Sequence, residues 1–99
     1  MTPPSQQLHL FALLTLGMIE SLANGVLSAT AALRVFFHPE NGLFVRKQLR
    51  DKIADTIMSH SIQLPDLFEA LPTEEAHWEF QRELVIMRSL CLQLLEDKR

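Results

Sequence analysis

The sequence predicts an all-α fold, a small antiparallel bundle of four to five helices of which three are longer and one or two are short. Apolar residues recur at three- and four-residue spacing in both halves of the chain, and no apolar segment follows the two-residue period of a strand. The apolar fraction of 47% and the charged fraction of 21% are typical of a globular chain. We therefore expect one helical domain over residues 5–99, preceded by a disordered lead over residues 1–4.

The most apolar part of the chain, residues 8–37, is predicted to form two helices. Asn24-Gly25 suits the left-handed turn that ends many helices, and Ser28 suits the N-cap of a following helix. The predicted helices therefore cover residues 5–23 and 28–37. The alternative is one long helix with a groove of small residues along one side.

The first of these helices is predicted to be apolar almost all round. One broad arc is expected to face the core and contains Leu8, Phe11, Leu14, Met18, Ile19 and Leu22. Leu10 and Leu13 lie on the other side of the same helix. A helix that is apolar on all sides is either central in its fold or shared with a partner. A domain of 99 residues can cover few helices on every side. We therefore expect a homodimer or a complex with a helical partner protein.

The middle of the chain is predicted to contain a turn, a helix and a short connector. Residues 38–42 contain one proline and an Asn-Gly pair, which favour a turn. The helix is predicted over residues 43–59. Its expected inward stripe is Val45, Leu49, Ile53, Thr56, Ile57 and His60. A short connecting helix is predicted over residues 64–71, where Pro72 ends it.

The last helix, predicted over residues 73–96, carries two apolar stripes. The first has spacings of four, three, four and three residues, typical of the seam of an antiparallel bundle, and comprises Phe80, Leu84, Met87, Cys91 and Leu94. The second has a spacing of seven and lies on roughly the opposite side. Two stripes require more partners than a small monomer offers. The predicted partner-binding residues are Leu10, Leu13, Trp78, Val85 and Leu92.

The sequence offers no pattern for a metal, a cofactor or a membrane span. The four histidines share no helical ligand spacing and are His9, His38, His60 and His77. Cys91 is the only cysteine, and we expect a buried, inert thiol, which fits a reducing cytoplasm. The apolar run that ends before Glu20 is shorter than the roughly 20 residues that span a bilayer. We expect no metal, no cofactor and no membrane.

The best candidate for nucleic-acid contact is the basic run that contains Arg46, Lys47 and Arg50. Arg46 and Arg50 are one helical turn apart, so both side chains could reach phosphates. Asp51 and Asp55 dilute this patch, and the formal net charge of −3 opposes contact with an acidic polymer. Nucleic-acid binding is therefore an alternative interpretation and not the first one.

Glu20 is a carboxylate in an otherwise apolar helix. It is interpreted either as a functional carboxylate or as a structural partner of Arg34, His38 or Arg46, and exposure at the helix end is a third possibility. No serine lies in an activating motif and no glycine-rich loop is present. We therefore predict a non-enzymatic interaction module, an adaptor, regulator or inhibitor that self-associates. An enzyme built around Glu20 and a histidine is the third interpretation.

Overall fold

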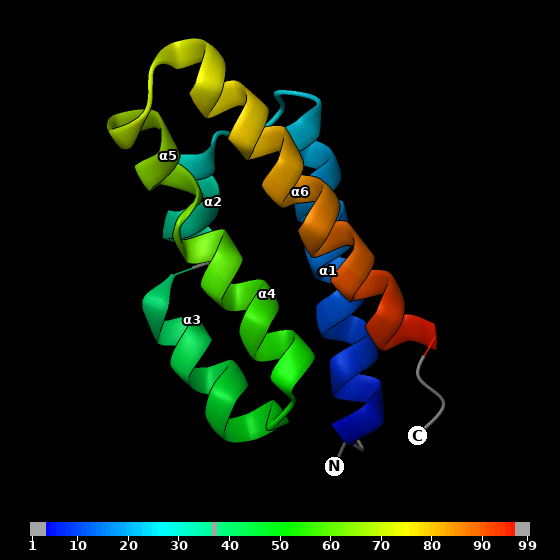
Figure 1. Cartoon of the computed structure of the whole chain (residues 1–99). Helices are drawn as coiled ribbons and strands as arrows, with labels where there is room; N and C mark the ends of the chain where they lie inside the picture. The colour runs from blue at the N-terminus through cyan, green and yellow to red at the C-terminus, as the bar shows by residue number, and fades with distance from the viewer. Residues whose placement is uncertain (1–3, 37, 97–99) are drawn as a thin grey trace.

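The computed structural model describes residues 4–36 and 38–96, which are helical apart from short connections (Figure 1). The two long helices, α1 (Pro4–Ala23) and α6 (Thr73–Glu96), pack antiparallel along a molecule with extents of 45 × 25 × 22 Å. Between them the chain forms α2 (Ala29–Val35), α3 (Pro39–Phe44), the π-helical segment η1 (Val45–Leu49), α4 (Lys52–Ile62) and α5 (Leu64–Ala70). The predicted all-α fold is confirmed.

The first helix begins within the predicted lead. Pro4 is the first residue of α1, where its fixed φ and missing N–H suit the first turn. Residues 1–3 of the predicted lead, and Phe37 at the predicted end of the second helix, lie outside the described residues.

The predicted break in residues 8–37 is confirmed, and it has the hydrogen bonds of a Schellman motif. The N–H of Val26 donates to the carbonyl of Ser21 at 2.9 Å, and the N–H of Gly25 donates to that of Leu22 at 3.3 Å. Gly25 has a φ of +73°, a conformation that glycine adopts without steric cost. The hydroxyl of Ser28 then accepts the N–H of Ala31 at 3.1 Å and caps α2.

The predicted turn over residues 38–42 is wrong, because these residues begin α3. His38 is the N-cap, and its Nδ1 accepts the N–H of Glu40 at 3.1 Å. Pro39 occupies the first turn of the helix, where it is tolerated. The Asn41-Gly42 pair is helical, and the Asn41 amide donates to the carbonyl of Phe36 at 2.7 Å. Local side-chain caps therefore outweigh the turn propensity of the sequence.

The predicted single helix over residues 43–59 is also wrong, because the chain reverses direction at Arg50. Arg50 is left-handed, with φ 49° and ψ 46°, and its N–H closes η1 by donating to the carbonyl of Val45 at 3.3 Å. Asp51 then caps α4, since its Oδ1 accepts the N–H groups of Ile53 at 2.9 Å and Ala54 at 3.1 Å. Segments α3–η1 and α4 thus form a helical hairpin whose tip lies at the end of the molecule where α1 begins (Figure 1).

The core lies between the inner faces of α1, α4 and α6. The predicted seam of α6 is confirmed, because Phe80, Leu84, Met87, Cys91 and Leu94 are all buried. Alanines with no exposed surface lie on α1, α2, α4 and α6 and are Ala12, Ala32, Ala54 and Ala76. Small side chains at these positions let neighbouring helices approach closely. Of the predicted stripe in the middle helix, Val45, Leu49 and Ile57 are buried but belong to two segments, and Thr56 is exposed.

Buried polar side chains bond to the backbone of their own helices. The Thr15 hydroxyl donates to the carbonyl of Phe11 at 2.7 Å, and the Ser61 hydroxyl lies 2.9 Å from the carbonyl of Ile57. Within residues 4–36 and 38–96, every buried side-chain nitrogen or oxygen has a hydrogen-bond partner. In the same ranges, no helix combines the length and the apolar composition that crossing a bilayer requires.

Candidate protein-binding surfaces

The outer face of α1 is an exposed, uncharged surface, which we call the α1 surface and define as Leu10, Leu13, Leu14 and Gly17. Leu10 and Leu13 are each 55% exposed and Leu14 is 59% exposed. Spacings of three and four residues place the four on one side of the helix. The first two were predicted as partner-binding residues, and the structure leaves both uncovered by the chain itself.

The prediction that Leu14 faces the core is wrong. Ala12 and Thr15, each with no exposed surface, occupy the inner face of α1 in its place. The inner arc is therefore shifted around the helix relative to the arc of largest apolar residues. Successive residues of an α-helix are about 100° apart, so Leu14 points away from the face on which Thr15 is buried.

An apolar groove of about 400 Å³ runs beside the α1 surface, between α1 and the α3–η1 segment. Its lining residues are Gln7, Leu10, Phe11, Leu14, Phe36, Asn41, Phe44, Val45, Leu49 and Met58. Phe44 is 60% exposed, and Phe11 stacks on Phe36 with ring centroids 6.3 Å apart. Because Leu10 and Leu14 belong to both features, the groove and the α1 surface are continuous.

The second predicted stripe lies on the outer face of α6, and we call it the α6 stripe: Trp78, Val85 and Leu92. These side chains are 78%, 64% and 43% exposed. Arg82 and Arg88, both exposed, lie three residues before and three residues after Val85. Their positions around the helix place one guanidinium on each side of the stripe. Sequence reasoning missed these two arginines because it followed apolar residues only.

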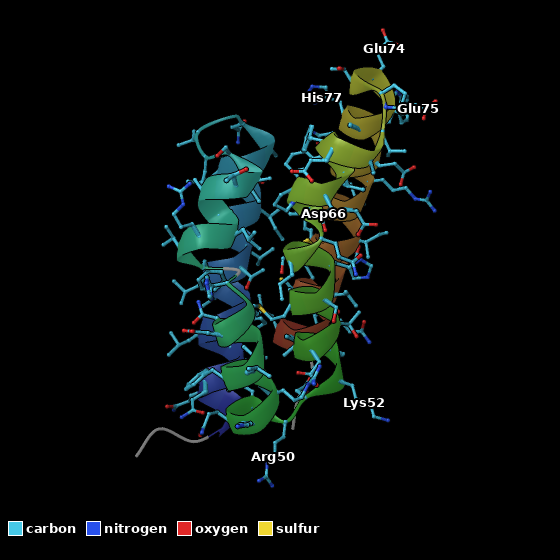
Figure 2. The ribbon with its side chains drawn as sticks, turned by 90° about the vertical axis from the view of Figure 1, so that its left-hand side faces the viewer. Arg50, Lys52, Asp66, Glu74, Glu75 and His77 are labelled. Atoms are coloured by element: carbon cyan, nitrogen blue, oxygen red, sulfur yellow. The ribbon has the colours of Figure 1, made fainter. Side chains whose placement is uncertain are left out.

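The two ends of the molecule carry opposite charges. At the hairpin tip, Arg46, Lys47, Arg50 and Lys52 are exposed, whereas Asp51 is buried as the cap of α4. Figure 2 shows Arg50 and Lys52 at this end and Glu74 and Glu75 at the other. Asp66 and Glu69, on α5, are also exposed. The predicted nucleic-acid residues are therefore accessible, and one of the two aspartates expected to dilute them points inward.

Glu20 lies in the last turn of α1 and is exposed. Its Oε2 accepts a hydrogen bond from the Asn24 side chain at 3.3 Å, and its carbonyl accepts another at 2.8 Å. The carboxylate therefore supports the C-terminal turn of α1 in place of the predicted ion pair with a basic residue. It stands in solvent at the helix end, which was the third of the sequence-based possibilities.

The histidines occupy separate structural positions. His60 Nδ1 pairs with Glu83 Oε2 and joins α4 to α6, and both side chains are partly buried. His77 packs edge-on against Phe68 with centroids 5.4 Å apart. Across the described ranges, no group of three or more His, Cys, Asp or Glu side chains is placed to hold a metal ion.

Cys91 lies on the inner face of α6 with no exposed surface. Burial raises the pKa of its thiol from 9.0 to about 12, because the thiolate would lose its hydration. The thiol therefore stays protonated at neutral pH, where it is a poor nucleophile. The prediction of a buried thiol is confirmed.

A second hollow, of about 560 Å³, lies where the α1–α2 turn meets α5 and α6. Its apolar wall includes Leu22, Leu27, Phe68 and Phe80. The ionisable residues of its lining, Glu69 and His77, are both exposed side chains at its rim.

No protein-family model matches the chain, and comparisons with curated proteins and with solved structures found no match.

Proposed function

We propose that this protein is a non-enzymatic interaction module that self-associates as a two-fold dimer through the α1 surface. The observation that carries the proposal is the uncovered apolar face of α1, where three leucines are more than half exposed beside an apolar groove. Exposed apolar residues that cluster in this way mark protein–protein contacts. We place the protein in the reducing cytoplasm, which suits a lone free cysteine.

The α1 surface suits a second copy because it has no charge of its own. In an antiparallel pairing of two α1 helices centred between Leu13 and Leu14, Leu10 of one protomer lies opposite Gly17 of its partner. Gly17 has no atom within 4 Å of the position where a Cβ would stand, so the gap beside it is open. A leucine side chain can fill such a gap and bring the two helices close together.

The charges around this pairing are also compatible. Glu20 of one protomer would lie opposite Gln7 of its partner, whose amide can donate to the carboxylate. The basic hairpin tip lies at the end of the molecule where α1 begins, and Glu74 and Glu75 lie at the other end (Figures 1 and 2). An antiparallel dimer therefore brings ends of opposite charge toward each other.

Solution mass tests the dimer. Sedimentation equilibrium of the wild-type chain should give a dimer that dissociates at micromolar concentration or below. Leu13→Glu should weaken the dimer by at least about a hundredfold, since two desolvated carboxylates would lie near the two-fold axis. Val35→Glu is the matched control, because Val35 is 73% exposed on α2 and lies outside the α1 surface. A wild-type monomer at all concentrations would contradict the proposal.

Nucleic-acid binding through Arg46, Lys47 and Arg50 is the second candidate. The specific observation in its favour is the exposed basic tip, from which Asp51 is withdrawn as a helix cap. Phosphate contacts would make binding fall steeply with salt. Salt-sensitive retention of the wild type on a nucleic-acid column, lost in the Arg46→Ala, Arg50→Ala double variant, would support this candidate. Equal retention of both chains would exclude it.

A further inference from the structure

We propose that the α6 stripe binds an acidic amphipathic helix of a different protein. This inference rests on the proposed interaction function, but it uses the opposite long helix and a surface separate from the dimer contact. It assigns the chemistry of the partner from the charges that flank the stripe.

The stripe has the dimensions of a helix-binding site. Trp78, Val85 and Leu92 are exposed on one side of α6, and the fourteen steps from the first residue to the last span roughly 21 Å at 1.5 Å per residue. A partner helix of about four turns covers that length. Tryptophan is a residue type enriched among the anchors of protein interfaces, and here it is the most exposed of the three.

The charges beside the centre of the stripe are basic, whereas the carboxylates Glu74 and Glu75 lie one turn before Trp78. From Gln81 to Gln93, the exposed residues of α6 include Arg82 and Arg88 and no carboxylate. Glu83 is partly buried and pairs with His60 on α4. Arg82 lies 3.7 Å from Glu79 in an exposed pair, which contributes little and is readily exchanged for another carboxylate. Both guanidinium groups can therefore reach an incoming helix.

A second copy of this chain does not suit the stripe. In an antiparallel two-fold pairing with Val85 on the axis, Arg82 of one protomer would lie opposite Arg88 of its partner. The same register sets Glu74 opposite Glu96, and a parallel pairing would set each charge against itself. Like charges in direct opposition weaken an interface, so the surface discriminates against its own copy.

The partner that fits has apolar residues every seven positions and carboxylates on both sides of the central one. Arginine holds carboxylates through two parallel hydrogen bonds, which fixes the register of the partner as well as attracting it. The apolar residues would cover the stripe while the carboxylates reach Arg82 and Arg88. This is the helix-in-groove mode of recognition with charge added for selectivity.

Two synthetic helical peptides test the proposal. Both are acetylated, amidated and about four to five turns long, with leucine every seventh residue. One has glutamate on both sides of the central leucine, and the other has lysine at those positions. Trp78 is the only tryptophan of the chain, so its fluorescence reports contact with the stripe directly.

We expect the glutamate peptide to shift the Trp78 emission and to bind at least about tenfold more tightly than the lysine peptide. The Arg82→Glu, Arg88→Glu double variant should reverse that preference. Arg34→Glu, an exposed change on α2, is the matched control and should leave it intact. We expect circular dichroism to show that each variant is folded, because all three substituted positions are exposed.

Several results would overturn the inference. The inference is wrong if the two peptides bind equally well or if neither binds at up to about 1 mM. It is also wrong if the double variant keeps the preference for the glutamate peptide. Binding lost in Leu13→Glu and kept in the double variant would place the peptide on the α1 surface instead. Dissociation of the dimer by Val85→Glu would assign the stripe to a second copy. Sedimentation of Leu13→Glu tests the dimer without any peptide, and the peptide titrations test the α6 stripe. A failure of the proposed dimer can therefore be distinguished from a failure of this inference.

Discussion

The α1 surface and the α6 stripe are the outer faces of the two long helices, and they differ in charge more than in apolar character. Both expose three large apolar side chains. The α1 surface has no arginine or lysine beside it and only Glu20 one turn beyond Gly17, whereas exposed arginines lie on both sides of Val85 at the centre of the α6 stripe. Apolar area favours association with any apolar surface, and flanking charge decides which surface is accepted. The comparison therefore predicts a self-complementary contact on α1 and a contact with a foreign acidic helix on α6.

The largest expected effect separates the two faces of α6. Leu84 is 3% exposed, and Leu84→Ala should lower the free energy of unfolding by about 2–5 kcal/mol, because it leaves a cavity in the core. Its neighbour Val85 is 64% exposed, so Val85→Ala should change the same quantity by no more than about 0.5 kcal/mol. Urea unfolding followed by circular dichroism measures both. A large loss in Val85→Ala would mean that the α6 stripe is part of the fold and not a free surface.

Salt should separate the α1 surface from the α6 stripe with a smaller effect. Two exposed arginine–carboxylate pairs are worth roughly 0.2–1 kcal/mol each. Raising NaCl from about 0.05 M to about 0.5 M should therefore weaken binding of the glutamate peptide by about three- to tenfold. The dimer should lose less affinity than the peptide complex over the same range, because its contact surface is uncharged and only its distant, oppositely charged ends attract each other. A dimer as salt-sensitive as the peptide complex would remove the distinction between the two surfaces.

Residues 73–96 show where sequence reasoning succeeds in this fold. Pro72 ends the preceding segment, the acidic pair Glu74 and Glu75 occupies the first turn, and the inner seam repeats without interruption. Each local signal agrees with the packing, so the helix and its buried seam are predicted correctly. The same agreement of local signals predicts the break at Gly25.

Residues 38–59 show where sequence reasoning fails in this fold. The chain reverses at Arg50 and Asp51, a position without glycine or proline, and the left-handed conformation of Arg50 has no sequence signal of its own. Asp51 could have been recognised as an N-cap, but it also fits the charged side of a continuous helix. The Asn41-Gly42 pair is a turn signal that helix caps and packing override. Tertiary contacts choose between such local alternatives.

The candidate surfaces were predicted in part. The seven-residue spacing located the α6 stripe, and the apolar circumference of the first helix located Leu10 and Leu13. Leu14 was placed on the inner arc by its helical spacing from Phe11 and Met18, but it lies at the edge of that arc, and Ala12 and Thr15 are buried instead. The charge contrast between the two ends was invisible in sequence order, because it depends on the reversal at the hairpin tip.

The smallest expected effect tests the α1 surface through its glycine. Gly17 is an exposed helical residue with an open position for a Cβ, so Gly17→Ala should raise the free energy of unfolding of the monomer by roughly 0.5–1 kcal/mol. In the proposed dimer the added methyl group would meet Leu10 of the partner and hold the two helices apart. We therefore expect the dimer to weaken by about three- to tenfold while the monomer becomes more stable.

A more stable monomer together with a weaker dimer would indicate a contact at Gly17. An ordinary change in helix propensity would stabilise the monomer without weakening the dimer. Unfolding of the dimerisation-deficient Leu13→Glu background gives the stability of the monomer, and sedimentation of the single Gly17→Ala variant gives the dissociation constant. Gly42→Ala is a useful contrast, because a Cβ there would lie 3.3 Å from Ile62 Cδ1 and its gain should be smaller. If Gly17→Ala stabilises the monomer and leaves the dimer unchanged, the two α1 helices do not approach at Gly17. The antiparallel register would then be wrong, even where Leu13→Glu still breaks the dimer.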